Sequence, residues 1–273
     1  MPIITLLTDF GSHDYFVGAM KGVILSINPQ ARVVDITHEI PPHDIDAAAF
    51  NLFAVYRSFP AGTVHLSVVD PGVGSSRRPI LVSGGGQFFV GPDNGIFSYV
   101  CEQEHDCRVI HLTNERFFRL PVSATFHGRD VFAPVAAALS KGVEPTEFGT
   151  EAGDYVKLAP LAPKKTKLGL EGRVIHIDRF GNCITNLTRE DLSDEMIASG
   201  VLLLINDREI DSFRNFFAEE AAGQAELFAI WGSAGFLELA AQNTSAAELL
   251  RARRGQSILV NLKAQASKGR TLN

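Results

Sequence analysis

The stretch "PIITLLTDFGSHDYFVGAMKGVILSIN", residues 2–28, decides the fold class. Its first part, residues 2–10, is a nearly continuous apolar run, which is typical of a strand buried on both faces of a sheet. In residues 14–28 apolar side chains return at three- and four-residue spacing, which predicts a helix. Those positions are Phe16, Met20, Val23, Ile24 and Ile27. A buried strand that leads into a helix is the unit from which mostly parallel sheets are built.

The same alternation of strand and helix continues along the first half of the chain. Asp44 precedes an apolar helical pattern and is a suitable N-cap, and Gly142 ends the last such pattern. A run of three glycines at residues 84–86 predicts the tight turn of a hairpin. The expected elements are strands at 31–40 and 62–70, helices at 44–59 and 129–142, and a hairpin at 78–95.

Composition changes at residues 156–172, where proline and lysine are frequent and a linker is expected. Beyond this stretch, short apolar runs separated by turn residues predict mainly antiparallel strands. We therefore predict an α/β fold with two domains. Residues 1–160 would form an α/β domain with a mostly parallel sheet, and residues 161–273 a smaller antiparallel β domain.

The bulk composition excludes several classes of function. The net charge is -6, from 25 basic and 31 acidic residues, which argues against a nucleic-acid partner. No apolar run approaches the roughly 18 residues that span a membrane, and the first residues do not resemble a signal peptide. The three cysteines, Cys101, Cys107 and Cys183, have no metal-site spacing, so we expect reduced thiols and a cytoplasmic protein.

Polar side chains follow the predicted parallel strands. Asp9 and Asp14 come after the first strand, His38 after the second and Asp70 after the third. Ligands of open α/β sheets bind beyond the carboxyl ends of the strands, so these residues are candidates together. Asp9 suits either of two functions, which are binding a ribose diol and capping the next helix.

Two further motifs combine residue types that handle water or protons. In "VVDPGVGSSRRPI", residues 68–80, Asp70 ends a strand and a glycine-rich turn leads to Arg77. The alternative is an ordinary turn with surface arginines. In "ATFHGRDVF", residues 124–132, His127 stands at the start of a helix, and histidine suits proton transfer near neutral pH.

The second half offers a site for a flat base. "HIDRFGNCITN", residues 176–186, places Asp178, Phe180 and Asn182 in a turn between two strands. A ring and an amide can bind adenine by stacking and by hydrogen bonding to its edge. The alternative interpretation of these residues is an ordinary β-turn. A second turn, in "WGSAGFLELA", offers Ser233.

Together these motifs resemble the adenosine-forming S-adenosylmethionine hydrolases, which are relatives of the fluorinases and chlorinases. The motifs that occur in the family's order are "TDFG…D", "VVDPGVGSSRR", "GPDNG", "FHGRD", "DRFGNCITN" and "GSAGFLELA". The resemblance implies that water or hydroxide attacks ribose C5′ of S-adenosylmethionine and forms adenosine and methionine. We expect no cofactor and no metal. The resemblance also implies a homotrimer with active sites between neighbouring subunits.

The family's functional residues can be carried over by motif. Asp70, Arg77 and His127 match a trio that handles the water. Asp9 matches the position that binds the ribose hydroxyls, and Asp14 the position that holds the methionine end. The matches on the adenine side are Asp178, Phe180 and Asn182, and Ser233 matches the group that binds the methionine carboxylate.

The chain departs from the halogenase pattern. The halogenases have Tyr-Pro-Ala-Thr where this chain has residues 70–73, and Tyr-Ser where it has His127 and Gly128, so halide use is not expected. The fluorinase has arginine at the position of Ala234, which leaves the group that binds the methionine carboxylate open. His43 replaces a tryptophan near the ribose.

Two other interpretations stay open at this point. A metal-assisted hydrolase could use carboxylates and histidines from the strand ends, although no HxH or HxxxH pair occurs. The residues concerned are Asp9, Asp14, His38, Asp70 and His127. A sensor that binds adenosine or S-adenosylmethionine without converting it would need the pocket but not the trio.

Overall fold

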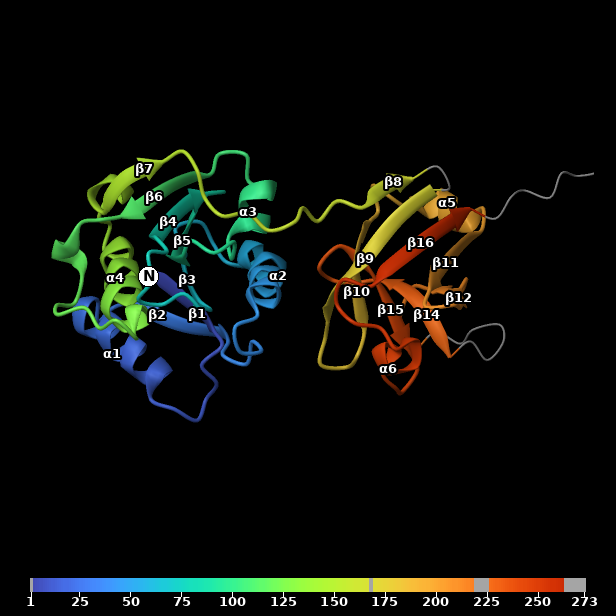
Figure 1. The fold of residues 1–273 in the computed structure, drawn as a ribbon, viewed down its shortest axis with the longest axis horizontal. Helices are drawn as coiled ribbons and strands as arrows, with labels where there is room; N and C mark the ends of the chain where they lie inside the picture. Colours follow the sequence, from blue (N-terminus) through green and yellow to red (C-terminus); the bar gives the residue numbers. More distant parts are fainter. Residues whose placement is uncertain (1, 167–168, 219–225, 263–273) are drawn as a thin grey trace, which may run out of the picture. The chain divides into compact units, whose positions relative to one another are not determined.

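The structure is a computed structural model that describes residues 2–166, 169–218 and 226–262. It divides the chain into two units, Met1–Pro160 and Leu161–Asn273, which we call the first and the second unit (Figure 1). Each unit is described by itself. In the ranges given above, no helix is both long enough and apolar enough to cross a membrane.

A seven-stranded sheet forms the centre of the first unit. Its strands are β1 (Ile3–Thr8), β2 (Arg32–Thr37), β3 (Val64–Val68), β4 (Pro79–Gly84), β5 (Gln87–Pro92), β6 (Arg108–Leu112) and β7 (Gly149–Ala152). Their order is β2-β1-β3-β5-β4-β6-β7. Only β4 and β7 run against the others, because β1 pairs in parallel with β2 and β3, and β3 with β5. The prediction of a mostly parallel sheet is therefore confirmed.

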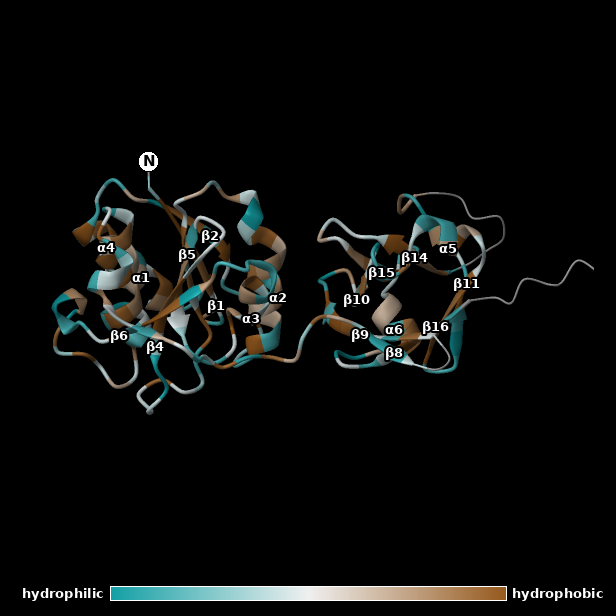
Figure 2. Ribbon diagram, turned by 90° about the horizontal axis from the view of Figure 1, so that it is seen from above, coloured by the Kyte–Doolittle hydropathy of each residue, from teal (hydrophilic) through white to brown (hydrophobic). Residues whose placement is uncertain are grey.

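Helices cover both faces of this sheet. They are α1 (Phe16–Ile27), α2 (Ile45–Val55), α3 (Ser98–Gln103) and α4 (Ala133–Ser140), with short helical turns at Tyr56–Ser58, Glu115–Phe117 and Pro145–Glu147. In Figure 1, α1 and α4 lie on one side of the sheet, and α2 and α3 lie on the other. Leu6 packs in the core with α1 and α4, and the next residue, Leu7, packs in the core with α2 and α3. Successive strand residues point to opposite faces, so a sheet covered on both sides requires an unbroken apolar run. Brown, hydrophobic segments accordingly run along α4 and beside β5 in Figure 2.

Two local predictions are confirmed in the first unit. The Asp44 carboxylate accepts a hydrogen bond from the N–H of Ala47 at 3.0 Å and so caps α2. Gly85 and Gly86 have φ of 58° and 73° and connect β4 to β5. Two successive positive φ values define the tight hairpin turn that glycine adopts most easily.

The helix predicted at residues 129–142 begins differently. Gly128–Phe132 forms a wide π-helical turn, and the regular α-helix starts only at Ala133. Pro134 has no N–H to donate to the carbonyl of Asp130, and that carbonyl accepts instead from the N–H of Arg119 at 2.8 Å. A contact with a distant segment therefore replaces the first regular helical turn.

The second unit is mainly antiparallel, as predicted. Its strands are β8 (Lys164–Thr166), β9 (Gly169–Ile177), β10 (Cys183–Thr188), β11 (Val201–Ile205), β12 (Arg208–Ile210), β13 (Phe213–Arg214), β14 (Leu227–Trp231), β15 (Phe236–Ala241) and β16 (Ser257–Leu262), and its helices are α5 (Asp194–Ala198) and α6 (Ala246–Leu250). Eight of these strands follow the order β12-β11-β16-β9-β10-β15-β14-β13 in the sheet, and β8 pairs with β9. Among the strand pairs that the structure describes in this unit, only the short pair β13 and β14 is parallel.

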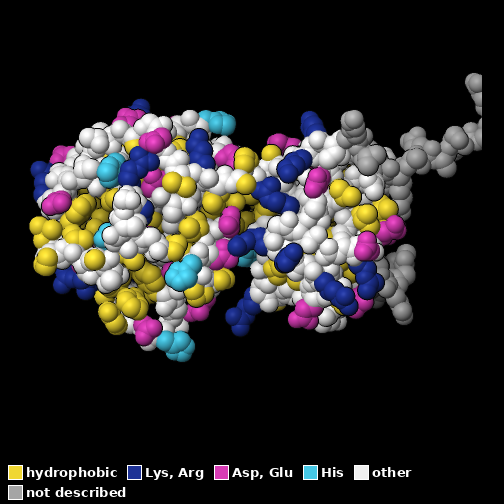
Figure 3. Space-filling model, viewed as in Figure 1, with side chains coloured by type: hydrophobic (Ala, Val, Ile, Leu, Met, Phe, Trp, Pro, Cys, Tyr) yellow, Lys and Arg dark blue, Asp and Glu magenta, His cyan; other side chains and the backbone are white. Residues whose placement is uncertain are grey.

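The predicted linker at residues 156–172 is wrong in its second part. β8 and the beginning of β9 fall inside it, and they pair antiparallel from Lys164 opposite Glu171 to Thr166 opposite Gly169. Residues 167 and 168 lie outside the described residues. Composition did not reveal this pairing because the ladder joins backbone groups and leaves the lysine side chains in solvent. Basic and acidic side chains are interspersed over the face shown in Figure 3.

Candidate active site

Asp70 and Arg77 form a buried ion pair at the end of β3. Arg77 Nε donates to Asp70 Oδ1 at 2.9 Å and to Oδ2 at 3.1 Å, and Arg77 Nη2 also contacts Oδ2. Their side chains are only 5% (Asp70) and 10% (Arg77) exposed. The turn between them is tight, because Gly74 has a φ of 76° and a Cβ there would lie 2.2 Å from the carbonyl oxygen of Ala124. This close approach joins the turn after β3 to the segment that leads to His127.

His127 joins the pair through the same guanidinium. Arg77 Nη2 donates to His127 Nδ1 at 3.0 Å. Burial, and then the positive charge of Arg77, lower the pKa of His127 from its ordinary value of 6.5. The ring is therefore neutral at pH 7, and because Nδ1 accepts a hydrogen bond, the proton sits on Nε2.

Arg77 keeps one donor without a partner. Its Nη1 is buried and has no hydrogen-bond partner among the described residues. The guanidinium carbon lies 5.1 Å from the centroid of the Phe132 ring, which fixes the plane of the group. Buried donors are nearly always satisfied, so an unsatisfied one beside a carboxylate and an imidazole suits a bound polar molecule.

The second arginine of the motif serves another contact. Arg78 Nη2 pairs with Asp93 at 2.6 Å, and Arg78 Nη1 pairs with Asp154 at 2.8 Å. The other oxygen of Asp93 accepts from the N–H of Val156 at 2.8 Å. Arg78 therefore holds the segment that follows β7 and lies outside the Asp70–Arg77–His127 cluster.

Asp9 and Asp14 lie on the segment between β1 and α1. Asp9 Oδ2 accepts from the backbone N–H of His43 at 2.9 Å, and His43 has a positive φ of 67°. Asp9 does not cap α1, whose N-cap residue is Tyr15, so the capping interpretation is wrong. Asp14 is exposed just before that helix.

Four of the five residues of the metal alternative, Asp9, His38, Asp70 and His127, are engaged in other contacts. Asp70 is paired with Arg77, and the His38 ring hydrogen-bonds to Thr8 at 2.9 Å. Across the described part of the chain, no three His, Cys, Asp or Glu side chains gather in a group that could hold a metal ion.

In the second unit, Asp178 organises the turn between β9 and β10. Its Oδ1 accepts from the N–H groups of Phe180 at 2.9 Å and Asn182 at 2.8 Å, and its Oδ2 accepts from the Asn182 side chain at 2.9 Å. Gly181, with a φ of 83°, completes the turn. The result leaves the Phe180 side chain 79% exposed.

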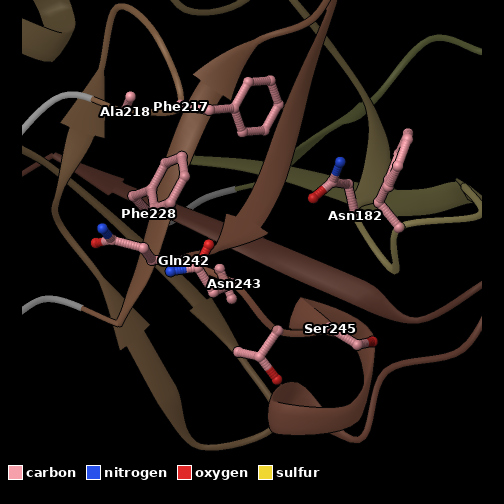
Figure 4. Close-up of a pocket in the computed structure, with 10 residues that line it drawn as sticks. Asn182, Phe217, Ala218, Phe228, Gln242, Asn243 and Ser245 are labelled. Carbon is pink, nitrogen blue, oxygen red and sulfur yellow. The ribbon is translucent and has the colours of Figure 1, made fainter.

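Phe180 and Asn182 line a pocket of about 640 Å³. Figure 4 shows Phe217 and Phe228 on one side of it and Asn182 on the other. Sequence reasoning missed the remaining lining residues, which are Phe217, Ala218, Phe228, Ala241, Gln242, Asn243, Thr244 and Ser245. For residues 242–245 of this list, the one available signal in the sequence was a polar run directly after the apolar β15.

Ser233 lies exposed in the turn between β14 and β15, near an acidic side chain that the sequence did not indicate. Glu238 packs on the backbone of this turn, since a Cβ on Gly232 would lie 1.8 Å from Glu238 Oε1. Burial, and then the charge of Asp178, raise the pKa of Glu238. Glu238 thus stands between the turn that holds Ser233 and the turn that holds Asp178.

Comparison with known proteins assigns the chain to a family. The model for the N-terminal domain of SAM (S-adenosylmethionine) hydroxide adenosyltransferase matches residues 4–149, and the model for its C-terminal domain matches residues 172–259. The chain belongs to the SAM hydroxide adenosyltransferase family. It is 37% identical over 263 residues to the (R)-S-adenosyl-L-methionine hydrolase of Methanocaldococcus jannaschii, with 92% of both chains covered.

A second curated relative and a solved structure are similar to the chain over nearly its full length. The (R)-S-adenosyl-L-methionine hydrolase of Thermus thermophilus is 37% identical over 262 residues, which cover 93% of this chain and 98% of the relative. A crystal structure of an uncharacterized conserved protein from Thermotoga maritima has a TM-score of 0.86 and 35% identity. The match covers 94% of this chain and 99% of that one.

Proposed function

We propose that this chain hydrolyses S-adenosyl-L-methionine to adenosine and L-methionine. Membership of the family and the names of two relatives support the reaction, and those names specify the (R) isomer of the substrate. Water or hydroxide attacks ribose C5′, the bond from C5′ to sulfur breaks, and methionine leaves as a neutral thioether. Because the leaving group is neutral, the reaction needs no general acid.

The observation that carries the proposal is the cluster of Asp70, Arg77 and His127. The unpartnered Nη1 of Arg77 and the Nε2–H of His127 are donors for the attacking oxygen. Such donors stabilise an oxyanion strongly where water is excluded. Hydroxide and sulfonium neutralise one another as they react, so a dry site favours their encounter, and a fixed oxygen in line with the C–S bond removes much of the entropic cost.

The arrangement also bears on which group takes the proton from water. His127 Nδ1 already accepts from Arg77, and its other nitrogen carries a proton, so the neutral ring offers no free acceptor. The cluster therefore acts by stabilising hydroxide rather than by using His127 as a base. Asp70 holds the guanidinium in place through both carboxylate oxygens.

The substrate contacts follow the family match. Residues 1–160 would contain the site of the attacking water, and residues 161–273 would bind the adenine base. Asp9 would bind the ribose hydroxyls, Asp14 the methionine end and Ser233 the methionine carboxylate. Phe180 and Asn182 would bind adenine, and Asp178, whose oxygens are engaged within its own turn, would position them.

The same family resemblance leads us to propose a homotrimer with active sites between subunits and with S-adenosylmethionine as its small-molecule partner. The three free cysteines lead us to propose that the protein is cytoplasmic. Light scattering after size exclusion should give about 89 kDa for three chains of 29.6 kDa each. A mass of about 30 kDa at micromolar concentration would refute the trimer.

The reaction is tested with purified protein, each sulfonium isomer of S-adenosylmethionine, a chelator and no halide, in water enriched in ¹⁸O. We expect adenosine and methionine in equal amounts, with ¹⁸O in the 5′-hydroxyl of adenosine and none in methionine. Label in another product, or adenosine without label, would exclude attack of water at C5′. Intact substrate at high protein concentration would favour the sensor, and loss of turnover with chelator would favour the metal-assisted hydrolase.

A further inference from the structure

Two of the cysteines, Cys101 and Cys107, lie together in the first unit, outside the cluster described above. Cys101 belongs to α3, and Cys107 immediately precedes β6. Their side chains are close enough for each to affect the ionisation of the other, and both are half-buried free thiols. The chain turns back between them, where the N–H of Cys107 donates to the carbonyl of Glu104 at 3.3 Å.

The position of the Cys107 sulfur depends on a glycine in the sheet. A Cβ on Gly84, at the end of β4, would lie 2.7 Å from Cys107 Sγ. The sulfur therefore occupies the space that the missing side chain leaves. Both cysteines also pack at the edge of the apolar core that α2 and α3 form with the sheet. This packing keeps the two thiols beside one another.

The surroundings of Cys101 favour its thiolate. Tyr155 lies close enough to Cys101 to affect its ionisation, and Lys157 contributes a positive charge, with its Nζ 4.9 Å from the centroid of the Tyr155 ring. The side chain of Cys107, and then these neighbours, lower the pKa of Cys101 below 9.0, whereas the pKa of Cys107 is raised by the same partner. The thiolate is the nucleophile in thiol oxidation, so the two cysteines differ in reactivity.

We propose that Cys101 and Cys107 form a reversible disulfide when a hydroperoxide oxidises Cys101. The Cys101 thiolate attacks one peroxide oxygen, the O–O bond breaks, and water leaves after protonation, so that Cys101 becomes a sulfenic acid. The Cys107 thiol then attacks this sulfur, the S–S bond forms, and a second water leaves. In sum, two thiols and one hydrogen peroxide give one disulfide and two waters, and a dithiol reductant reverses the change.

The third cysteine provides an internal control. Cys183 is fully buried at the start of β10, and burial raises the pKa of its thiol to about 12. It should therefore stay reduced under conditions that oxidise the pair.

The experiment treats the folded protein with a small excess of hydrogen peroxide at pH 7, alkylates the remaining thiols after denaturation and digests with trypsin. Both thiols of the pair fall in one peptide, residues 78–108, because the bond before Pro79 resists trypsin. We expect this peptide about 2 Da lighter than its reduced form and unalkylated. The Cys183 peptide should be fully alkylated, and dithiothreitol should restore alkylation of the pair. An alkylated pair, or a disulfide between two chains, would overturn the proposal.

Two variants separate the functions of the thiols. Cys107→Ser should retain the sulfenic acid on Cys101, which dimedone labels, and Cys101→Ser should lower the rate of thiol oxidation at least about tenfold. Oxidation of Cys107 in Cys101→Ser at the wild-type rate would contradict the assignment. If either variant fails to fold, wild-type protein is treated with phenylarsine oxide, which needs two adjacent thiols. One equivalent should block oxidation of the pair, and absence of blocking would refute their proximity.

Discussion

Replacing Arg77 by methionine tests the whole cluster, because one guanidinium contacts both of the other members. The change keeps most of the side-chain volume and removes the bonds to Asp70 and His127, together with the free donor Nη1. Loss of a donor to a developing oxyanion typically lowers kcat by about 10²–10³. We expect a loss of at least this size in the ¹⁸O assay.

The same substitution should also destabilise the first unit. The Asp70 side chain is 5% exposed and would lose its partner, and removing one member of a buried ion pair costs about 3–5 kcal/mol. A double variant, Asp70→Asn with Arg77→Met, leaves no unpaired charge. It should recover most of the free energy of unfolding, measured in urea, while its hydrolysis rate stays low.

Arg116→Met is the matched control. Arg116 forms an exposed ion pair with Glu147, and such pairs contribute less than about 1 kcal/mol. Its rate and stability should stay near those of wild type. If Arg77→Met keeps half of the wild-type rate, or if the double variant regains rate together with stability, the assignment of Arg77 to the chemistry is refuted.

Three further outcomes follow from contacts elsewhere. Burial lowers the pKa of His65 to about 4 from an ordinary 6.5. As pH falls, His65 is therefore protonated in the unfolded chain before it is protonated in the folded one. The free energy of unfolding should drop by about 2 kcal/mol between pH 7 and pH 5. His65→Gln should show a shallower decline in urea titrations at the two pH values, and an unchanged slope would contradict this. Gly74→Ala should lower both stability and hydrolysis, because its Cβ would meet a carbonyl oxygen at 2.2 Å, whereas Gly62→Ala has a similar φ of 80° and open space. Equal losses in thermal melts of the two variants would show that backbone strain alone is responsible. Phe180→Ala should raise KM for S-adenosylmethionine with less than about 0.5 kcal/mol change in stability, because the ring is 79% exposed, and Phe216→Ala, 58% exposed and outside the pocket lining, should leave KM unchanged. Equal KM values for the two variants would remove Phe180 from the adenine site.

Local patterns in the sequence predicted much of the first unit. The nearly continuous apolar run of β1 reflects burial on both faces, and the cap at Asp44 needs only the backbone N–H three residues later. The hairpin at residues 84–87 likewise depends on glycines within the turn itself. These features depend on residues only a few positions apart, so the local amino-acid sequence is enough to predict them.

Predictions failed where a distant segment supplied the deciding contact. At the π-helical turn before α4, the carbonyl of Asp130 accepts from the N–H of Arg119, a contact outside the predicted helix. β8 is an exception: it pairs with β9 only a few residues later, and it was missed because its exposed lysines carry no apolar pattern. Glu238 gave no signal, because its position between two turns results from the pairing of β14, β15 and β10.

The sequence by itself determined the alternation of strands and helices, the two-part composition and the set of motifs that marks the family. Only the tertiary structure decided which atoms meet. Arg77 donates to both oxygens of Asp70 and to Nδ1 of His127, and the Asp178 carboxylate accepts hydrogen bonds from the backbone of the turn to which it belongs. The physical reason is that propensity and periodicity act over a few residues. The partners of buried polar groups depend on which distant segments the fold brings together, because each such group must be satisfied there.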